Sequence, residues 1–251
     1  MKLRSSSQFR AWKSARHAGA LLVACTLTVL GNQQPTAVAQ DLTTAIQFEP
    51  AHLADENGDR PTDPAALLYD IRSDPGALPI TAPDGHHITL GEWQAVRGEA
   101  HISRIPGGTE LTLDVSGLVP NGVYTAWSAF FTESPFIVPN AVGFGAAGKN
   151  DGSEGTLIAD ENGTATYTVE VPPGPLSVRG EAPDYVLDGH AAYLVSGAYH
   201  IDSQTHGAVP GPNSVGAFSA TFIPEPSSVT LALIGAVGLV GLTSVRRPAT
   251  T

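Results

Sequence analysis

Cysteine is almost absent from this chain, with one residue, Cys25, among 251. It lies in an N-terminal segment that has the features of a signal peptide. Removal of that segment would leave a chain that can form no disulfide and can hold no metal through a thiolate. A blue-copper centre is excluded in the same way, since it needs a cysteine ligand. Stability must then come from packing or from bound ions.

Basic residues are also scarce, with 13 Lys and Arg against 24 Asp and Glu. Five of the 13 lie within the first 17 residues, so the rest of the chain has eight basic residues and a net charge near −16. This excess of acid argues against binding to the phosphates of nucleic acids. It suits solubility in saline surroundings, and it would attract divalent cations or basic partners.

The motifs of several common catalytic sites are missing as well. The sequence has no Gly-x-Ser-x-Gly elbow, no phosphate-binding loop and no dinucleotide fingerprint. Carboxylates are numerous, but their spacing does not say which of them converge. We therefore predict no catalytic residue and expect a protein that is not an enzyme.

The N-terminus has the three parts of a secretory signal peptide. Residues 1–17 are basic and contain no acid, residues 18–30 are apolar, and Ala37-Val38-Ala39 has the small residues that a signal peptidase requires. This pattern predicts a signal peptide over residues 1–39, cleaved before Gln40. An alternative remains, because residues 22–25 also match a lipoprotein box that would leave a lipidated Cys25 as the new N-terminus.

The C-terminus contains the longest apolar run of the chain, residues 229–245, which has no charged residue. As a helix this run would be about 25 Å long, slightly short of a bilayer core of about 30 Å. Glycines at 235, 238 and 241 are compatible with a membrane helix. The run therefore predicts a transmembrane helix, with Arg246 and Arg247 holding the short tail 248–251 on the cytoplasmic side.

Residues 223–247 closely resemble the PEP-CTERM sorting signal of exported bacterial proteins. The resemblance assigns Pro224, Glu225 and Pro226 to the recognition motif, residues 229–245 to the membrane segment, and Arg246 with Arg247 to the basic stop. It implies a partner, an exosortase in the membrane, that processes the signal and releases the protein to the cell surface or extracellular polymer. The alternative is an ordinary C-terminal anchor whose prolines only end the helix.

Residues 40–87 form an acidic segment rich in Pro and Gly, which we expect to be poorly defined and which could add one strand or a helix turn. Its clear apolar stretch is 65–71. Oxygen side chains at Asp55, Asn57 and Asp59, with Asp63 further on, have the spacing of a calcium-binding loop. Arg60 and Ala66 replace the Gly and Glu of that loop, so an exposed acidic turn is the alternative.

Residues 88–222 have the pattern of strands. Apolar residues alternate with polar ones at 111–115 and at 165–171, and turn-forming residues separate these runs from five others: 98–105, 122–131, 155–159, 191–201 and 215–222. The fold class predicted is mostly β, a single antiparallel β-sandwich of the immunoglobulin-like or jelly-roll type. We expect its core to contain Trp93, Tyr124, Trp127, Phe130 and Phe131.

Several phrases in this region are similar to those of an uncharacterised family of secreted bacterial and archaeal β-domains. They include residues 117–125, 148–155 and 173–177, followed by 199–202, 205–207 and 210–212. The resemblance implies a secreted β-domain. It brings no assigned activity and no catalytic residue.

One cluster in the β-domain predicts a metal site. His200, Asp202 and His206 lie within seven residues, and a turn at residues 203–204 could bring the second histidine back toward the first. Two imidazoles and a carboxylate can bind zinc, iron or copper. The alternative is that both histidines end a strand and hydrogen-bond the Gly-Pro loop at 210–212. His190 lies ten residues upstream of His200 in the sequence. His86 and His87 form a second cluster of potential ligands, and an exposed loop explains that pair equally well.

Two hypotheses of function follow from these observations. The first, which we prefer, is a non-enzymatic surface or matrix protein, exported and sorted through its C-terminal signal, that binds polysaccharide, cations or other proteins. The second is a metal-binding protein or metal-dependent enzyme that uses His200, Asp202 and His206. A divalent cation is the cofactor that the residues suggest.

Overall fold

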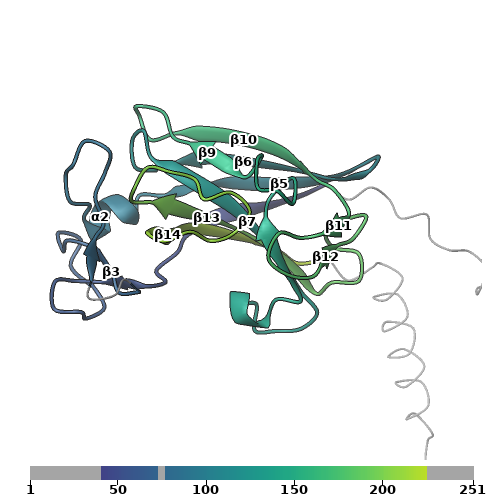
Figure 1. The fold of residues 1–251 in the computed structure, drawn as a ribbon, viewed down its shortest axis with the longest axis horizontal. Coiled ribbons are helices and arrows are strands. Elements are labelled where there is room, and N and C mark those ends of the chain that lie inside the picture. Colours follow the sequence, from purple (N-terminus) through teal and green to yellow (C-terminus); the bar gives the residue numbers. More distant parts are fainter. Residues whose placement is uncertain (1–40, 73–76, 225–251) are drawn as a thin grey trace, which may run out of the picture. The chain divides into compact units, whose positions relative to one another are not determined.

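A nine-stranded antiparallel sheet dominates the computed structural model, which describes residues 41–72 and 77–224 (Figure 1). Eight strands follow the order β10-β6-β5-β1-β14-β13-β7-β8, and β9 pairs with β7. Their bounds are β1 Leu42–Phe48, β5 Arg97–Ile105, β6 Gly108–Ser116, β7 Val123–Phe131, β8 Gly143–Ala146, β9 Thr156–Ile158, β10 Ala165–Val171, β13 Ala192–His200 and β14 Ser214–Phe222.

Two small sheets and two short helices complete the described elements. One sheet consists of β2 (Leu53–Ala54), β3 (Tyr69–Asp70) and β4 (Leu78–Pro79), and the other of β11 (Gly174–Pro175) and β12 (Glu181–Ala182). The helices are α2 (Leu90–Trp93) and the 3-10 turn η1 (Val138–Asn140).

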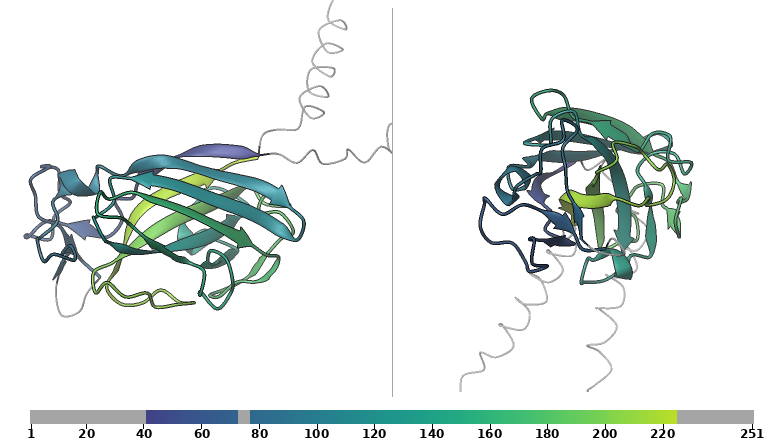
Figure 2. Two further views of the ribbon diagram at one scale, coloured as in Figure 1. Left: turned by 90° about the horizontal axis from the view of Figure 1, so that it is seen from above. Right: turned by 60° about the vertical axis from the view of Figure 1, so that its left-hand side comes forward.

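Strand β1 connects the two halves of the large sheet. Its residues 42–46 pair with β5, whereas Gln47 and Phe48 pair with β14. The chain thus passes from one half to the other within a single strand, and the sheet curls around its interior (Figure 2). One apolar cluster takes side chains from both halves, including Leu113 of β6 and Phe218 of β14.

Alternation along the strands decides which side chains enter this core. On β6, Leu111, Leu113 and Val115 are buried while Glu110 and Asp114 are exposed. Successive side chains of a strand point to opposite faces, so the apolar set lines the interior and the acidic set faces solvent. The core is therefore specified by the period of two that the sequence shows.

Residues 50–72 and 77–96 pack against one end of the curled sheet. Leu68, Ile80 and Ile88 from this segment are fully buried in the main core. The ring of Trp93 makes an edge contact with Tyr199 of β13, with 5.8 Å between the centroids. The hydroxyl of Tyr199 also donates to the carbonyl of Thr81. The small sheet and α2 consequently cover that end of the strands (Figure 1).

The mostly β, antiparallel character predicted from the sequence is confirmed. Each of the seven predicted strand runs overlaps an observed strand, and the bounds differ by at most three residues. The five aromatic residues expected in the core are all buried. The acidic segment before residue 88 adds β1 to the large sheet, whereas the apolar stretch 65–71 contains only the two-residue strand β3.

Among residues 41–72 and 77–224, no helix is both long and apolar enough to cross a membrane. The predicted membrane segment 229–245 lies outside the described residues. So do the signal peptide with Cys25, the tail 248–251, and Glu225, Pro226, Arg246 and Arg247. Pro224 is the last residue described, and Ile223 before it is 58% exposed.

Candidate metal centre

The three predicted ligands lie at the end of β13 and in the loop that follows it. β13 ends at His200, so Asp202 lies in a turn rather than on the strand. The backbone N–H of Ser203 donates to the carbonyl of His200, and Ser203 has a positive φ of 57°. This tight reversal sends the chain back over the end of the strand and brings His206 to His200. The turn therefore spans residues 200–203, slightly before the position 203–204 expected from the sequence.

His200 is a buried histidine with one satisfied ring nitrogen. Its Nε2 lies 2.8 Å from the hydroxyl oxygen of Thr125. Both residues are almost completely buried, with His200 1% and Thr125 2% exposed. Its Nδ1 is buried and has no hydrogen-bond partner. Burial, reinforced by the neighbouring His206 and opposed by Asp202, lowers the pKa of His200 to about 4. The ring is therefore neutral near pH 7, which is the form that binds metals.

His206 and Asp202 form the more exposed side of the site. Nε2 of His206 lies 3.0 Å from Oδ2 of Asp202, and their side chains are 23% and 26% exposed. The rings of His206 and His200 are 5.4 Å apart between centroids. One ligand atom from each of the three residues lies within 4.8 Å of the other two. This is close enough for all three to coordinate one ion after small side-chain movements.

Glycines allow the loop to close over the site. A Cβ on Gly211 would lie 1.9 Å from Cγ of His206, so the imidazole packs directly on the bare backbone there. Gly152, in the loop after β8, has a φ of 75° and similarly contacts the backbone of Gly207. Side chains at these positions would push the loop away from β13. The Gly-Pro loop therefore supports His206 by packing, while the hydrogen bonds of the two rings go to Thr125 and Asp202.

The other histidines singled out in the sequence belong to different environments. The ring of His190 packs on Phe130, with centroids 5.3 Å apart. His86 bonds to Asp84 through Nδ1 and to Glu92 through Nε2, and Nε2 of His87 lies 2.7 Å from the carbonyl oxygen of Leu68. Within the part of the chain that the structure describes, none of them joins a group of three potential metal ligands.

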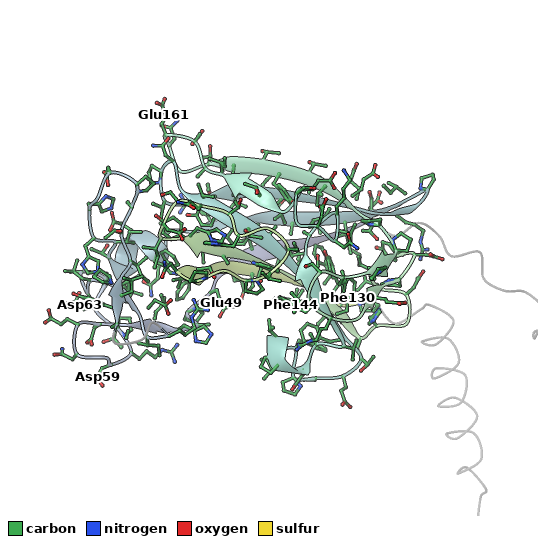
Figure 3. The ribbon with its side chains drawn as sticks, in the orientation of Figure 1. Glu49, Asp59, Asp63, Phe130, Phe144 and Glu161 are labelled. Carbon is green, nitrogen blue, oxygen red and sulfur yellow. The ribbon has the colours of Figure 1, made fainter. Side chains whose placement is uncertain are left out.

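The acidic loop at residues 55–63 uses its oxygens for its own backbone. Oδ1 of Asp55 accepts from the N–H groups of Asn57 and Asp59, at 2.8 and 3.0 Å. Oδ1 of Asp63 accepts from the N–H of Ala65. Asp59 and Asp63 project from the chain in Figure 3. These are the hydrogen bonds of Asx turns, and the calcium site at Asp55, Asn57 and Asp59 stays a prediction.

Thr125 is the residue of the candidate site that the sequence did not indicate. It lies on β7 opposite Ala198 of β13, on the face that points away from the main core. Because Thr125 lies 75 positions from His200 along the chain, the sequence does not indicate that the two side chains meet. The one visible signal is a threonine inside the apolar run of β7, whose burial pattern is nearly continuous.

No family model matches the chain, and no curated protein is similar to it in sequence. The chemistry of the site is therefore argued from its own geometry.

Proposed function

We propose that this chain is an exported, non-enzymatic surface or matrix protein, whose β-domain acts as a binding or structural module. The signal-like N-terminus and the PEP-CTERM resemblance at residues 223–247 support export and sorting. One observation on the domain carries the proposal. The sheet ends at Phe222, one residue before that region, and Ile223 is already 58% exposed. An exosortase could therefore process the motif without disturbing the folded domain.

A polar sheet face supports a role in binding. The strand registers align Thr43, His101, Thr112 and Thr168 across β1, β5, β6 and β10. The hydroxyl of Thr43 lies 2.8 Å from Nδ1 of His101, and those of Thr112 and Thr168 lie 3.1 Å apart. Two open hollows occur along these strands. A row of hydroxyl groups is suited to hydrogen-bonding an extracellular polysaccharide, and the acidic charge of the chain disfavours nucleic acid.

Mass spectrometry of the protein taken from its own cells tests export and processing. We expect a mature N-terminus at Gln40 and a C-terminus trimmed near residues 224–226. Glu225→Ala should retain the membrane segment, because the residue between the prolines is lost. Glu161→Ala, which changes an exposed acid in the turn before β10, is the matched control and should be processed normally. The full-length polypeptide in the soluble cytosolic fraction would refute the proposal.

The curled sheet also fits the β-sandwich class, immunoglobulin-like or jelly roll, that the sequence suggests. In support, β1 divides its pairing between the two halves, and Ile102 from one half and Val195 from the other belong to one core cluster. A sandwich in which one strand turns the corner between its sheets has both properties.

A second function, binding of a transition metal, is favoured by the state of His200. A buried imidazole nitrogen without a partner is uncommon and costly. Here it accompanies a second imidazole and a carboxylate within ligand range. We propose that a divalent cation is the cofactor of this site, for a metal-binding protein or a metal-dependent enzyme. Stoichiometric metal in the purified protein, lost in His206→Ala and kept in His101→Ala, is the expected result.

A further inference from the structure

The contact between Thr125 and His200 decides which nitrogen of His200 is free. A neutral imidazole carries one proton, on either Nε2 or Nδ1. With the proton on Nε2, the N–H donates to the Thr125 hydroxyl oxygen at 2.8 Å, and Nδ1 keeps its lone pair. With the proton on Nδ1, a buried N–H would have no acceptor. Because buried donors without acceptors are costly, the first tautomer is favoured.

We infer that the site binds a transition-metal ion of the zinc class through Nδ1 of His200, and that Thr125 is the positioning residue that holds His200 in the tautomer able to bind it. This inference rests on the metal-binding function proposed above. To that function it adds the ligand atom of His200, the class of ion, and a positioning residue, Thr125, on another strand. Hydrogen bonds from the second nitrogen of a metal-bound histidine commonly fix its orientation in this way.

The residue types select the class of ion. Calcium takes six to eight oxygen ligands, whereas this group offers two imidazoles and one carboxylate. Imidazole and carboxylate together suit zinc and its neighbours. His206 and Asp202 are partly exposed, so the side of the site away from His200 is open to water or a small ligand as a fourth partner. A divalent ion bound by Nε2 of His206 and Oδ2 of Asp202 would replace the proton that now links them.

The strand register of β7 and β13 brings Thr125 to His200. Thr125 lies opposite Ala198, and Tyr124 lies opposite Tyr199. Alternation puts Tyr124 and Tyr199 in the core and turns Thr125 and His200 to the other face. The two side chains therefore meet diagonally on that face, beneath the loop that carries Asp202 and His206. Binding at the loop is thus supported by a residue of β7 that is paired on both sides, with β13 and with β9.

The test measures Zn²⁺ affinity of the full chain, by competition with a chromophoric chelator, in four proteins. Thr125→Val removes the hydroxyl at nearly constant shape and should weaken binding about 10–100-fold. Thr125→Ser keeps the hydroxyl and should bind within a few-fold of wild type. Thr112→Val is the matched control, because it removes a strand threonine on the polar face, and it should leave binding unchanged. Nitrogen-15 NMR of the histidines should show Zn²⁺ shifting Nδ1 of His200.

The outcomes separate the two levels of the claim. Wild-type protein that fails to bind Zn²⁺ at about 1 mM overturns both the metal-binding function and this inference. Binding that is equal in wild type and Thr125→Val, or NMR coordination through Nε2 of His200, overturns the role of Thr125 alone. Displacement of Zn²⁺ by an equal concentration of Ca²⁺ overturns the class of ion. Thermal unfolding in chelator identifies a misfolded valine variant, and the NMR result on wild type then decides the assignment.

Discussion

The buried hydrogen bond between Ser128 and Tyr193 provides a direct test of the strand register on which the candidate site depends. Ser128 is on β7 and Tyr193 on β13, both are completely buried, and their hydroxyl oxygens lie 2.8 Å apart. Burial raises the pKa of Tyr193, so its hydroxyl remains protonated over the usual range of pH. The same pairing of β7 with β13 brings Thr125 to His200, and a one-residue slip would break both contacts.

A double-mutant cycle gives the expected magnitudes. Tyr193→Phe leaves the Ser128 hydroxyl buried without its partner, and Ser128→Ala does the same to Tyr193. Each single change should lower the free energy of unfolding by about 1–3 kcal/mol, the usual cost of a buried polar group left unpaired. The double variant removes both hydroxyls, so it should cost clearly less than the sum. We expect a coupling free energy of about 1–2 kcal/mol between the two residues.

Equilibrium urea unfolding of the four proteins, in chelator and at constant pH, measures this coupling. The exposed hydroxyl pair Thr112 and Thr168, 3.1 Å apart on β6 and β10, provides the control. Its cycle with two Thr→Val changes should give a coupling near zero, since water replaces the lost hydrogen bond. Additive costs for Ser128→Ala and Tyr193→Phe would refute the register, and with it the argument for Thr125.

Two further predictions concern packing and charge. Gly197→Ala should lower the free energy of unfolding in urea by about 1–3 kcal/mol, because its Cβ would lie 2.2 Å from the ring of Phe218. Adding Phe218→Leu should recover part of this loss. An unchanged stability of Gly197→Ala would contradict the packing. The Asp84 carboxylate, through its hydrogen bond, raises the pKa of His86 above its ordinary 6.5. That contact therefore stabilises the fold fully below pH 6.5 and is lost as pH rises through the raised value. In Asp84→Asn, NMR titration should show a lower His86 pKa, and the same value in both proteins would disprove the contact.

The strands with clear alternation could be predicted from sequence because the period of two is a local property. Residues 165–171 coincide with β10, and the turn-forming residues 162–163 lie in the chain reversal before that strand. β1 was harder to predict because its position depends on partners far along the chain. Gln47 pairs with Ser219, and nothing in the sequence near Gln47 indicates this pairing. A segment expected to add one strand thus provides the strand that joins both halves of the sheet.

The candidate site divides in the same way between local and distant contacts. His200, Asp202 and His206 could be grouped from their spacing, because a tight turn returns the chain over so short a distance. Thr125 could not, since only the pairing of β7 with β13 brings it to His200. Asp202 does not share a strand face with His200, because β13 ends two residues before Asp202. The loop geometry gives Asp202 its position instead.

A buried nitrogen without a hydrogen-bond partner occurs together with a group of three potential metal ligands at one place in the described chain, His200. Among the residues described, three buried side-chain nitrogens lack a hydrogen-bond partner: Trp93 Nε1, His190 Nδ1 and His200 Nδ1. Indole Nε1 is only a donor, so it cannot bind a metal. His190 packs on Phe130 and does not belong to a group of three potential ligands. His200, in contrast, belongs to a group with a second imidazole and a carboxylate, so an ion that binds there and satisfies the buried nitrogen stabilises the folded state.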